Sequence, residues 1–203
     1  MKDDRDAVLA NVRAALRNRP ERSPRPDFDP NALVVRKRLE GADLWEAFAR
    51  NFSGVRGYPM TTVDALAAFL RERKLFRGYC DPALKESVGE RLGADFSVVY
   101  EYSRSVVDEI DFGITRASGV IAETGTIILR DRATSNRLAA VAPWAHIAVV
   151  EPEAIHRTVG DALGAFDDDP NTIFVTGPSK TADVEGILIE GVHGPGEQVC
   201  LRL

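Results

Sequence analysis

The chain has 203 residues, of which 44% are hydrophobic, so it can bury one core and still carry an appendage. Residues 1–40 hold 10 Lys and Arg against 7 Asp and Glu, whereas the other 163 residues hold 16 against 24, a net charge of −8. An acidic body repels phosphate backbones, and the basic N-terminal part shows no interleaved aromatic residues. Nucleic-acid binding is therefore disfavoured.

Cysteine usage and apolar content exclude two further classes of protein. Cys80 and Cys200 lie in apolar, strand-like runs without the CxxC spacing of metal or redox sites, which predicts two buried free thiols. Two cysteines cannot ligate an iron–sulfur cluster that needs four. No apolar run approaches the length of about 18 residues that a membrane span requires, and the N-terminus lacks the apolar core of a signal peptide. We therefore expect a cytoplasmic protein without a membrane span.

Residues 1–30 are predicted to form an N-terminal arm. Val8, Val12 and Leu16 recur at helical spacing and give an amphipathic helix. A charged segment with four prolines follows, which predicts an extended connector. The helix is expected either to clasp its own domain or to dock on a partner.

Residues 31–100 are predicted to alternate helices with strands. Helical spacing over residues 31–51 indicates two helices, or one helix with a break at Gly41. Thr61 or Thr62 can cap a helix that starts near Val63. We further predict a first strand at residues 75–80, a helix at 82–92 and a second strand at 97–100.

Strands and helices continue to alternate up to the C-terminus. Apolar runs at residues 112–115 and 127–129 predict two buried strands, and β-branched residues predict a third at 146–150. Glu151-Pro152-Glu153 suits the first turn of a helix that reaches about residue 163. Two more strands are predicted at residues 172–176 and 198–203. The pattern predicts one α/β domain over residues 31–203, with a mostly parallel sheet flanked by helices.

The turn between the two central strands is Glu123-Thr124-Gly125-Thr126. It places a carboxylate, two hydroxyls and a glycine backbone at the end of a buried strand, where open α/β folds bind small molecules. We therefore predict that Thr124, Gly125 and Thr126 bind a ligand and that Glu123 is a catalytic carboxylate. Alternatively, Glu123 holds the turn or pairs with Arg116 or Lys180.

The second candidate motif is Thr176-Gly177-Pro178-Ser179-Lys180-Thr181, which follows a strand and precedes residues 182–185, a segment that can open a helix. Backbone N–H groups, hydroxyls and one ammonium would converge at that helix N-terminus, where anions bind. We assign to this ligand site Thr176, Gly177, Ser179, Lys180, Thr181 and Asp183. Alternatively, Ser179 or Thr181 only caps the helix. The spacing differs from GxxxxGK[ST], which argues against nucleotide hydrolysis.

His193 lies in a glycine-rich loop, GVHGPG, just before the last predicted strand. The flanking glycines leave its ring accessible, so it is a second catalytic candidate, as acid/base or as donor to an anion. His146 is placed just before a strand and His156 in a helix, and no HxH or HExxH spacing links the histidines, so we predict no metal site. The sequence also lacks GxSxG and GxGxxG, which disfavours a hydrolase triad and a nicotinamide dehydrogenase.

Three blocks of the C-terminal half resemble the lactate-utilisation protein C family, also called LutC/YkgG or LUD-domain proteins. They are ITRASGVIAETGTIIL, IFVTGPSKTADVEG and GVHGPGEQVCLRL, which begin at residues 114, 173 and 191. The resemblance implies the superfold of glucosamine-phosphate deaminases, ribose-phosphate isomerases and CoA-transferases (NagB/RpiA/CoA-transferase-like). It also implies a subunit that serves the oxidation of L-lactate to pyruvate beside iron–sulfur partner proteins, with no cofactor in this chain and with the clusters in the partner subunits.

Besides a pure interaction scaffold, which would place function on the arm with Val8, Val12 and Leu16, two hypotheses for function follow from the residues and the resemblance together. The first is a LutC-like subunit that binds a small anionic ligand or a partner in a pocket at the ETGT and TGPSKT loops. Under this hypothesis the subunit can also form a homo-oligomer. The second is an independent enzyme of the CoA-transferase or phosphosugar-isomerase type that uses Glu123 as nucleophile or base. AETG is similar to the SENG turn of CoA-transferases, whose glutamate attacks an acyl-CoA, although Thr124 stands in place of the asparagine.

Overall fold

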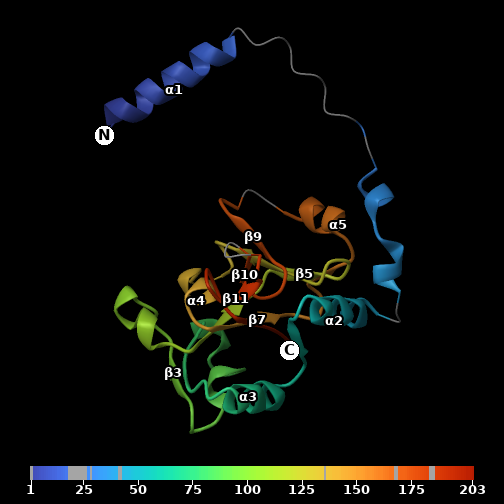
Figure 1. The fold of residues 1–203 in the computed structure, drawn as a ribbon, viewed down its shortest axis with the longest axis vertical. Coiled ribbons are helices and arrows are strands. Elements are labelled where there is room, and N and C mark those ends of the chain that lie inside the picture. Colours follow the sequence, from blue (N-terminus) through green and yellow to red (C-terminus); the bar gives the residue numbers. More distant parts are fainter. Residues whose placement is uncertain are drawn as a thin grey trace. The chain divides into compact units, whose positions relative to one another are not determined.

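An amphipathic helix forms the first element of the chain, as the sequence predicts. The computed structural model describes residues 2–17, 27, 29–40, 43–134, 136–166, 169–182 and 186–203 (Figure 1). These residues divide into two compact units, Met1–Ala32 and Leu33–Leu203. Helix α1 spans Lys2–Arg17 and exposes its predicted apolar stripe of Val8, Val12 and Leu16. Most of the proline-rich connector lies outside the described residues.

A fully parallel sheet is the centre of the second unit and confirms the predicted α/β class. Its described strands lie in the order β1-β12-β7-β4-β2-β3, and each neighbouring pair is parallel. Their bounds are β1 Tyr58–Met60, β2 Arg77–Cys80, β3 Ser97–Val99, β4 Phe112–Arg116, β7 Ala145–Val150 and β12 Glu197–Arg202. The sequence analysis missed β1, because its central Pro59 lacks the N–H that most strands use. Proline is tolerated here because β1 lies at the edge of the sheet.

A second, smaller sheet corrects the prediction that all strands belong to one sheet. It runs in the order β8-β5-β6-β9, with bounds β8 Ile155–His156, β5 Gly119–Ile121, β6 Thr126–Arg130 and β9 Thr172–Val175. Strand β6 is antiparallel to both β5 and β9, whereas β5 and β8 are parallel. The sequence analysis missed the short strand β5. Residues 122–125 are consequently the turn of an antiparallel hairpin and do not end a strand of the parallel sheet.

Three of the α-helices begin at residues whose side chains cap the first turn. Helix α2 (Leu44–Gly54) starts after Asp43, whose carboxylate accepts from Glu46 N at 2.7 Å, and α3 (Val63–Glu72) starts after Thr62, as predicted. Helix α4 spans Leu138–Val141. Helix α5 (Val159–Gly164) begins later than predicted, because Thr158 and Asp161 form a capping box there. His156 lies in β8 and not in a helix, and His146 lies within β7.

The first half of the predicted helical segment 31–51 and the predicted helix at 82–92 form short 3-10 turns instead, whereas the second half of segment 31–51 is helical as predicted. These turns are η1 Pro30–Leu33 and η2 Arg36–Leu39 in the first segment, and η3 Pro82–Leu84 and η4 Gly89–Arg91 in the second, with η5 at Arg104–Glu109. Leu39 and Leu84 are the buried apolar residues of these turns, whereas Leu33 is exposed. The predicted break at Gly41 lies outside the described residues.

The two faces of the parallel sheet are covered by different layers. Helix α3 and the 3-10 turns η3 and η4 pack on one face, around the side chains of Phe112, Ile114 and Ile147. Helix α2 and the smaller sheet pack on the other face, around Ala148 and Cys200 (Figure 1). Both cysteines are buried and free, as predicted. None of the described helices is long and apolar enough to cross a membrane.

Candidate functional site

Ser179 joins the two loops that carry the second motif and His193. Its N–H donates to Pro195 O at 2.8 Å, and Gly191 N–H donates to Ser179 O at 3.0 Å. The chain then continues as β10 (Lys180–Thr181), which pairs with β11 (Ile189–Glu190) in an antiparallel hairpin. Lys180 and Thr181 are therefore strand residues, and most of the segment predicted to open a helix, residues 182–185, lies outside the described residues. Asp183 and the rest of residues 183–185 lie outside the described residues.

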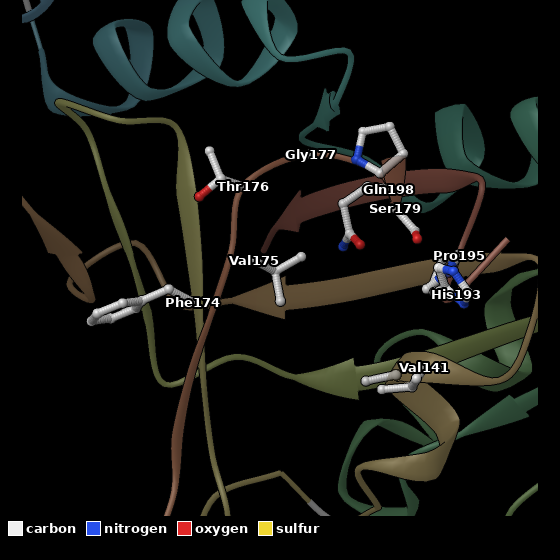
Figure 2. A pocket seen from close by; sticks show the side chains of 12 residues that line it. Val141, Phe174, Val175, Thr176, Gly177, Ser179, His193, Pro195 and Gln198 are labelled. Carbon is white, nitrogen blue, oxygen red and sulfur yellow. The ribbon is translucent and has the colours of Figure 1, made fainter. Parts of the chain in front are cut away.

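A pocket of about 330 Å³ opens where these loops meet the parallel sheet, and we call it the Gln198 pocket. Four side chains give it polar groups: Thr176, Ser179, His193 and Gln198. Thr176 and Ser179 belong to the loop after β9, His193 to the GVHGPG loop and Gln198 to strand β12 (Figure 2). The remaining lining is mainly apolar and consists of Ala140, Val141, Phe174, Val175, Gly177, Pro178, Gly194 and Pro195. Such a lining suits a small molecule with one apolar part and several polar atoms.

Beneath the pocket, Gln198 is held by a histidine buried in the sheet. Gln198 Nε2 donates to His146 Nδ1 at 2.8 Å, and His146 Nε2 lies 2.9 Å from Thr115 Oγ1. His146 is fully buried, and burial lowers its pKa to about 4. The ring is thus neutral near pH 7, accepts from Gln198 and donates to Thr115 through Nε2–H. This network fixes the orientation of the Gln198 carboxamide.

A smaller pocket of about 170 Å³, the arginine pocket, contains the predicted ligand residue Thr124. Its lining consists of Arg38, Arg50, Asn51, Gly54, Val55 and Thr124. Two arginines, both exposed, thus border a space at which the sequence analysis expected one hydroxyl.

Three threonine hydroxyls link the two pockets. Thr124 Oγ1 lies 2.7 Å from Thr126 Oγ1, which lies 2.8 Å from Thr176 Oγ1. Thr124 lines the arginine pocket and Thr176 lines the Gln198 pocket. The ETGT turn and the TGPSKT loop therefore meet in space, although they line different cavities.

The structure places Glu123 outside the lining of both pockets. Its side chain is 8% exposed, and Oε1 accepts from Val35 N–H at 2.9 Å. The two cations considered as its partners are engaged elsewhere: Arg116 pairs with Asp81 at 2.8 Å, and Lys180 lies 3.7 Å from Glu190. In this geometry Glu123 positions the segment before α2.

Glycine is required at two motif positions by packing against α2. Gly125 has a φ of 64°, and a Cβ there would lie 2.4 Å from Phe52 N. Gly177 has a φ of 80°, and a Cβ there would lie 2.3 Å from Val55 O. Both glycines serve close approach of backbone to backbone, which a side chain would prevent.

Several site residues were missed by the sequence analysis. Gln198 and His146 are polar residues that are buried within strands. Because buried polar residues are uncommon, a polar residue in an apolar run is a sequence feature that could have marked them as site residues. Arg50 and Asn51 lie on a helix whose surface positions look ordinary in sequence. Among the described residues, no group of three or more His, Cys, Asp or Glu side chains is placed to hold a metal ion.

Comparison with known proteins gives these pockets a family context. Proteins named lactate utilization protein C match at 34% identity over 98 residues in Oceanobacillus iheyensis and 38% over 99 residues in Deinococcus radiodurans. These matches cover 44% and 46% of this chain, and only 42% and 46% of the respective relatives. A protein of the same name from Geobacillus thermodenitrificans is 25% identical over 223 aligned positions, which cover 95% of this chain and 92% of that protein.

A solved structure shares the fold. The crystal structure of a DUF162 family protein from Deinococcus radiodurans matches with a TM-score of 0.50 and 20% identity, covering 79% of this chain and 94% of that one. The family model of the LUD domain matches residues 61–201, which include every residue lining the Gln198 pocket but only Thr124 of the arginine pocket. The chain therefore belongs to the LUD-domain family, as its sequence blocks predicted.

Proposed function

We propose that this protein is a LutC-like component of a lactate-utilising system and that it binds a small organic acid in the Gln198 pocket. Relatives named lactate utilization protein C support the biological context. One observation supports the site: Ser179, His193 and Gln198, from three separate chain segments, line one cavity.

The chemistry of the pocket suits a three-carbon acid. Ser179 and Thr176 offer hydroxyls, His193 offers an imidazole and Gln198 a carboxamide, all of which can hydrogen-bond a carboxylate, hydroxyl or keto oxygen. Val141 and Val175 supply the apolar wall that a methyl group would contact. A volume of about 330 Å³ lies at the lower end of the range for small-molecule sites, which favours a small ligand.

Electron transfer would then fall to partner proteins. Oxidation of lactate to pyruvate releases two electrons and two protons, and the acceptor must hold a redox group. Cys80 and Cys200 are both buried in the core, and two cysteines cannot ligate a four-cysteine cluster. We infer that any iron–sulfur clusters of the system belong to partner subunits.

The alternative of an independent transferase or isomerase on the NagB/RpiA/CoA-transferase-like superfold has less support. Its proposed nucleophile or base, Glu123, lines neither pocket and accepts a backbone hydrogen bond. A nucleophile must face the space that its substrate occupies.

Ligand binding can be tested by thermal unfolding with L-lactate, pyruvate, CoA and a sugar phosphate. A ligand at 100 times its Kd stabilises the native state by about 2.7 kcal/mol, which is readily measured as a rise in Tm. We expect a shift with L-lactate or pyruvate that is lost in Ser179→Ala and in His193→Gln. His156→Gln, in the smaller sheet, is the control. The proposal is wrong if neither acid binds, or if both pocket variants retain full affinity.

A further inference from the structure

We propose that the arginine pocket is a second, separate binding site, specific for a small dianion that carries a phosphate group or two carboxylates. The pocket lies between turn η2, helix α2 and the β5–β6 turn. Arg38, Arg50, Asn51 and Thr124 provide its polar lining, and Gly54 and Val55 complete it.

The three walls of the pocket are fixed to one another by side-chain hydrogen bonds. Asn51 Nδ2 donates to Arg38 O at 2.8 Å and to Ala122 O at 2.7 Å, so one amide ties η2 to the end of β5 across α2. Glu123 adds a second tie, because its carboxylate accepts from Val35 N–H just before η2. A cavity held open in this way loses little conformational entropy when a ligand enters.

Both guanidinium groups lack a carboxylate partner in the described part of the chain. Arg50 Nη2 donates to the main-chain carbonyls of Arg38 and Glu40, which orients the group without neutralising it. Its Nη1 and Nε donors make no further hydrogen bond there, and the Arg38 side chain makes none. Arginine donors in a planar fork match carboxylate and phosphate oxygens.

The negative end of the α2 dipole opposes anion binding, but it is the smaller effect. A helix C-terminus is equivalent to roughly half a negative charge, against two full positive charges here. Its carbonyls are also engaged: Phe52 O accepts from Val55 N and Gly57 N, and Ser53 O accepts from Arg56 N. Glu123 adjoins Thr124 in sequence and keeps its negative charge, but it lies outside the pocket lining and its Oε1 accepts from Val35 N–H.

Size and charge together select the ligand. A cavity of about 170 Å³ can hold inorganic phosphate or a dicarboxylate of three or four carbons, and it is too small for a nucleotide. Two positive charges are balanced by a dianion and only half balanced by a monoanion such as lactate. The Thr124 hydroxyl can donate to the ligand while it accepts from Thr126.

The test is isothermal titration calorimetry of the full chain with inorganic phosphate, malonate and acetate, at ionic strength held constant with sodium chloride. Arg38→Gln carries the test, because the Arg38 side chain holds no other part of the structure. Lys37→Gln removes the same charge from the same turn but lies outside the pocket lining and is the matched control. Ser179→Ala reports on the Gln198 pocket.

We expect saturable binding of phosphate or malonate that is at least tenfold weaker in Arg38→Gln and unchanged in Lys37→Gln and Ser179→Ala. The tighter of the two dianions identifies the ligand class, and acetate should bind at least tenfold more weakly than that dianion. Three results would overturn the proposal: no saturable binding of either dianion, equal weakening in Lys37→Gln, or binding that depends on Ser179 and not on Arg38. These outcomes do not depend on the proposed function, because a failure to bind lactate in the Gln198 pocket would change none of them.

Discussion

Mild acid should destabilise this protein through His146. Folding lowers the pKa of His146 from 6.5 to about 4, because the ring is fully buried between Thr115 and Gln198. At pH values between these two pKa values, His146 is protonated in the unfolded chain and neutral in the native protein. The stabilising contribution is therefore complete above pH 6.5 and is lost as the pH falls toward 4.

The size of the effect follows from the two pKa values. Each pH unit between them costs about 1.4 kcal/mol, so a fall from pH 6.5 to pH 4 removes about 3 kcal/mol of the free energy of unfolding. That loss is a large share of the 5 to 15 kcal/mol, roughly, that stabilise a typical domain. Asp95 and Asp169, whose pKa values are lowered in the native protein by their hydrogen bonds, add acid sensitivity below this range, as the pH falls through those lowered values.

Urea denaturation at pH 7.0, 6.0, 5.0 and 4.5 measures the slope of stability against pH. His146→Gln is the matched variant, because its amide can still hydrogen-bond Thr115 and cannot titrate. We expect the wild-type protein to lose about 1 kcal/mol more per pH unit than the variant below pH 6. Equal slopes in the two proteins would refute the reasoning. A direct NMR titration of the ring that gives a pKa near 6.5 would refute it as well.

Three further substitutions test the packing and hydrogen bonds at the motifs. Gly125→Ala should cost about 3 kcal/mol in urea denaturation, because its left-handed φ and the nearby Phe52 backbone exclude a side chain, whereas Gly164→Ala, with open space, should be neutral or stabilising. Thr126→Val should cost about 1 to 2 kcal/mol by breaking the hydroxyl chain, and a cost near zero would show that the chain is not stabilising. Glu123→Gln should lower stability by about 1 kcal/mol and leave ligand binding in the Gln198 pocket intact; loss of that binding without loss of stability would support a catalytic role instead.

Features with a local physical cause could be predicted from the sequence. Thr62 caps α3 because a side-chain oxygen before an apolar helical stripe satisfies an N–H of the first turn, and this depends only on neighbouring residues. The strand at residues 145–150 was similarly evident from its β-branched run. The family blocks were recognised because they are continuous stretches of the chain.

Features that depend on which strands pair could not be predicted. The runs at residues 127–129 and 172–176 look like strands of the parallel sheet, yet they pair antiparallel with each other in the second sheet. A strand signal reports alternation and propensity, and it does not identify the neighbour that accepts its hydrogen bonds. The helix predicted from Glu151 failed for a related reason, because pairing of Ile155–His156 with β5 delays its start until Thr158.

The sequence by itself determined the family, the parallel α/β class and the two motifs near the candidate site, because each can be recognised from continuous stretches of residues. Only the tertiary structure decided how those residues divide between two pockets. It placed Thr176, Ser179 and His193 around Gln198, and Thr124 beside Arg38 and Arg50. The physical reason is that a pocket is made by side chains from distant segments, whose meeting depends on the pairing and packing of the whole chain.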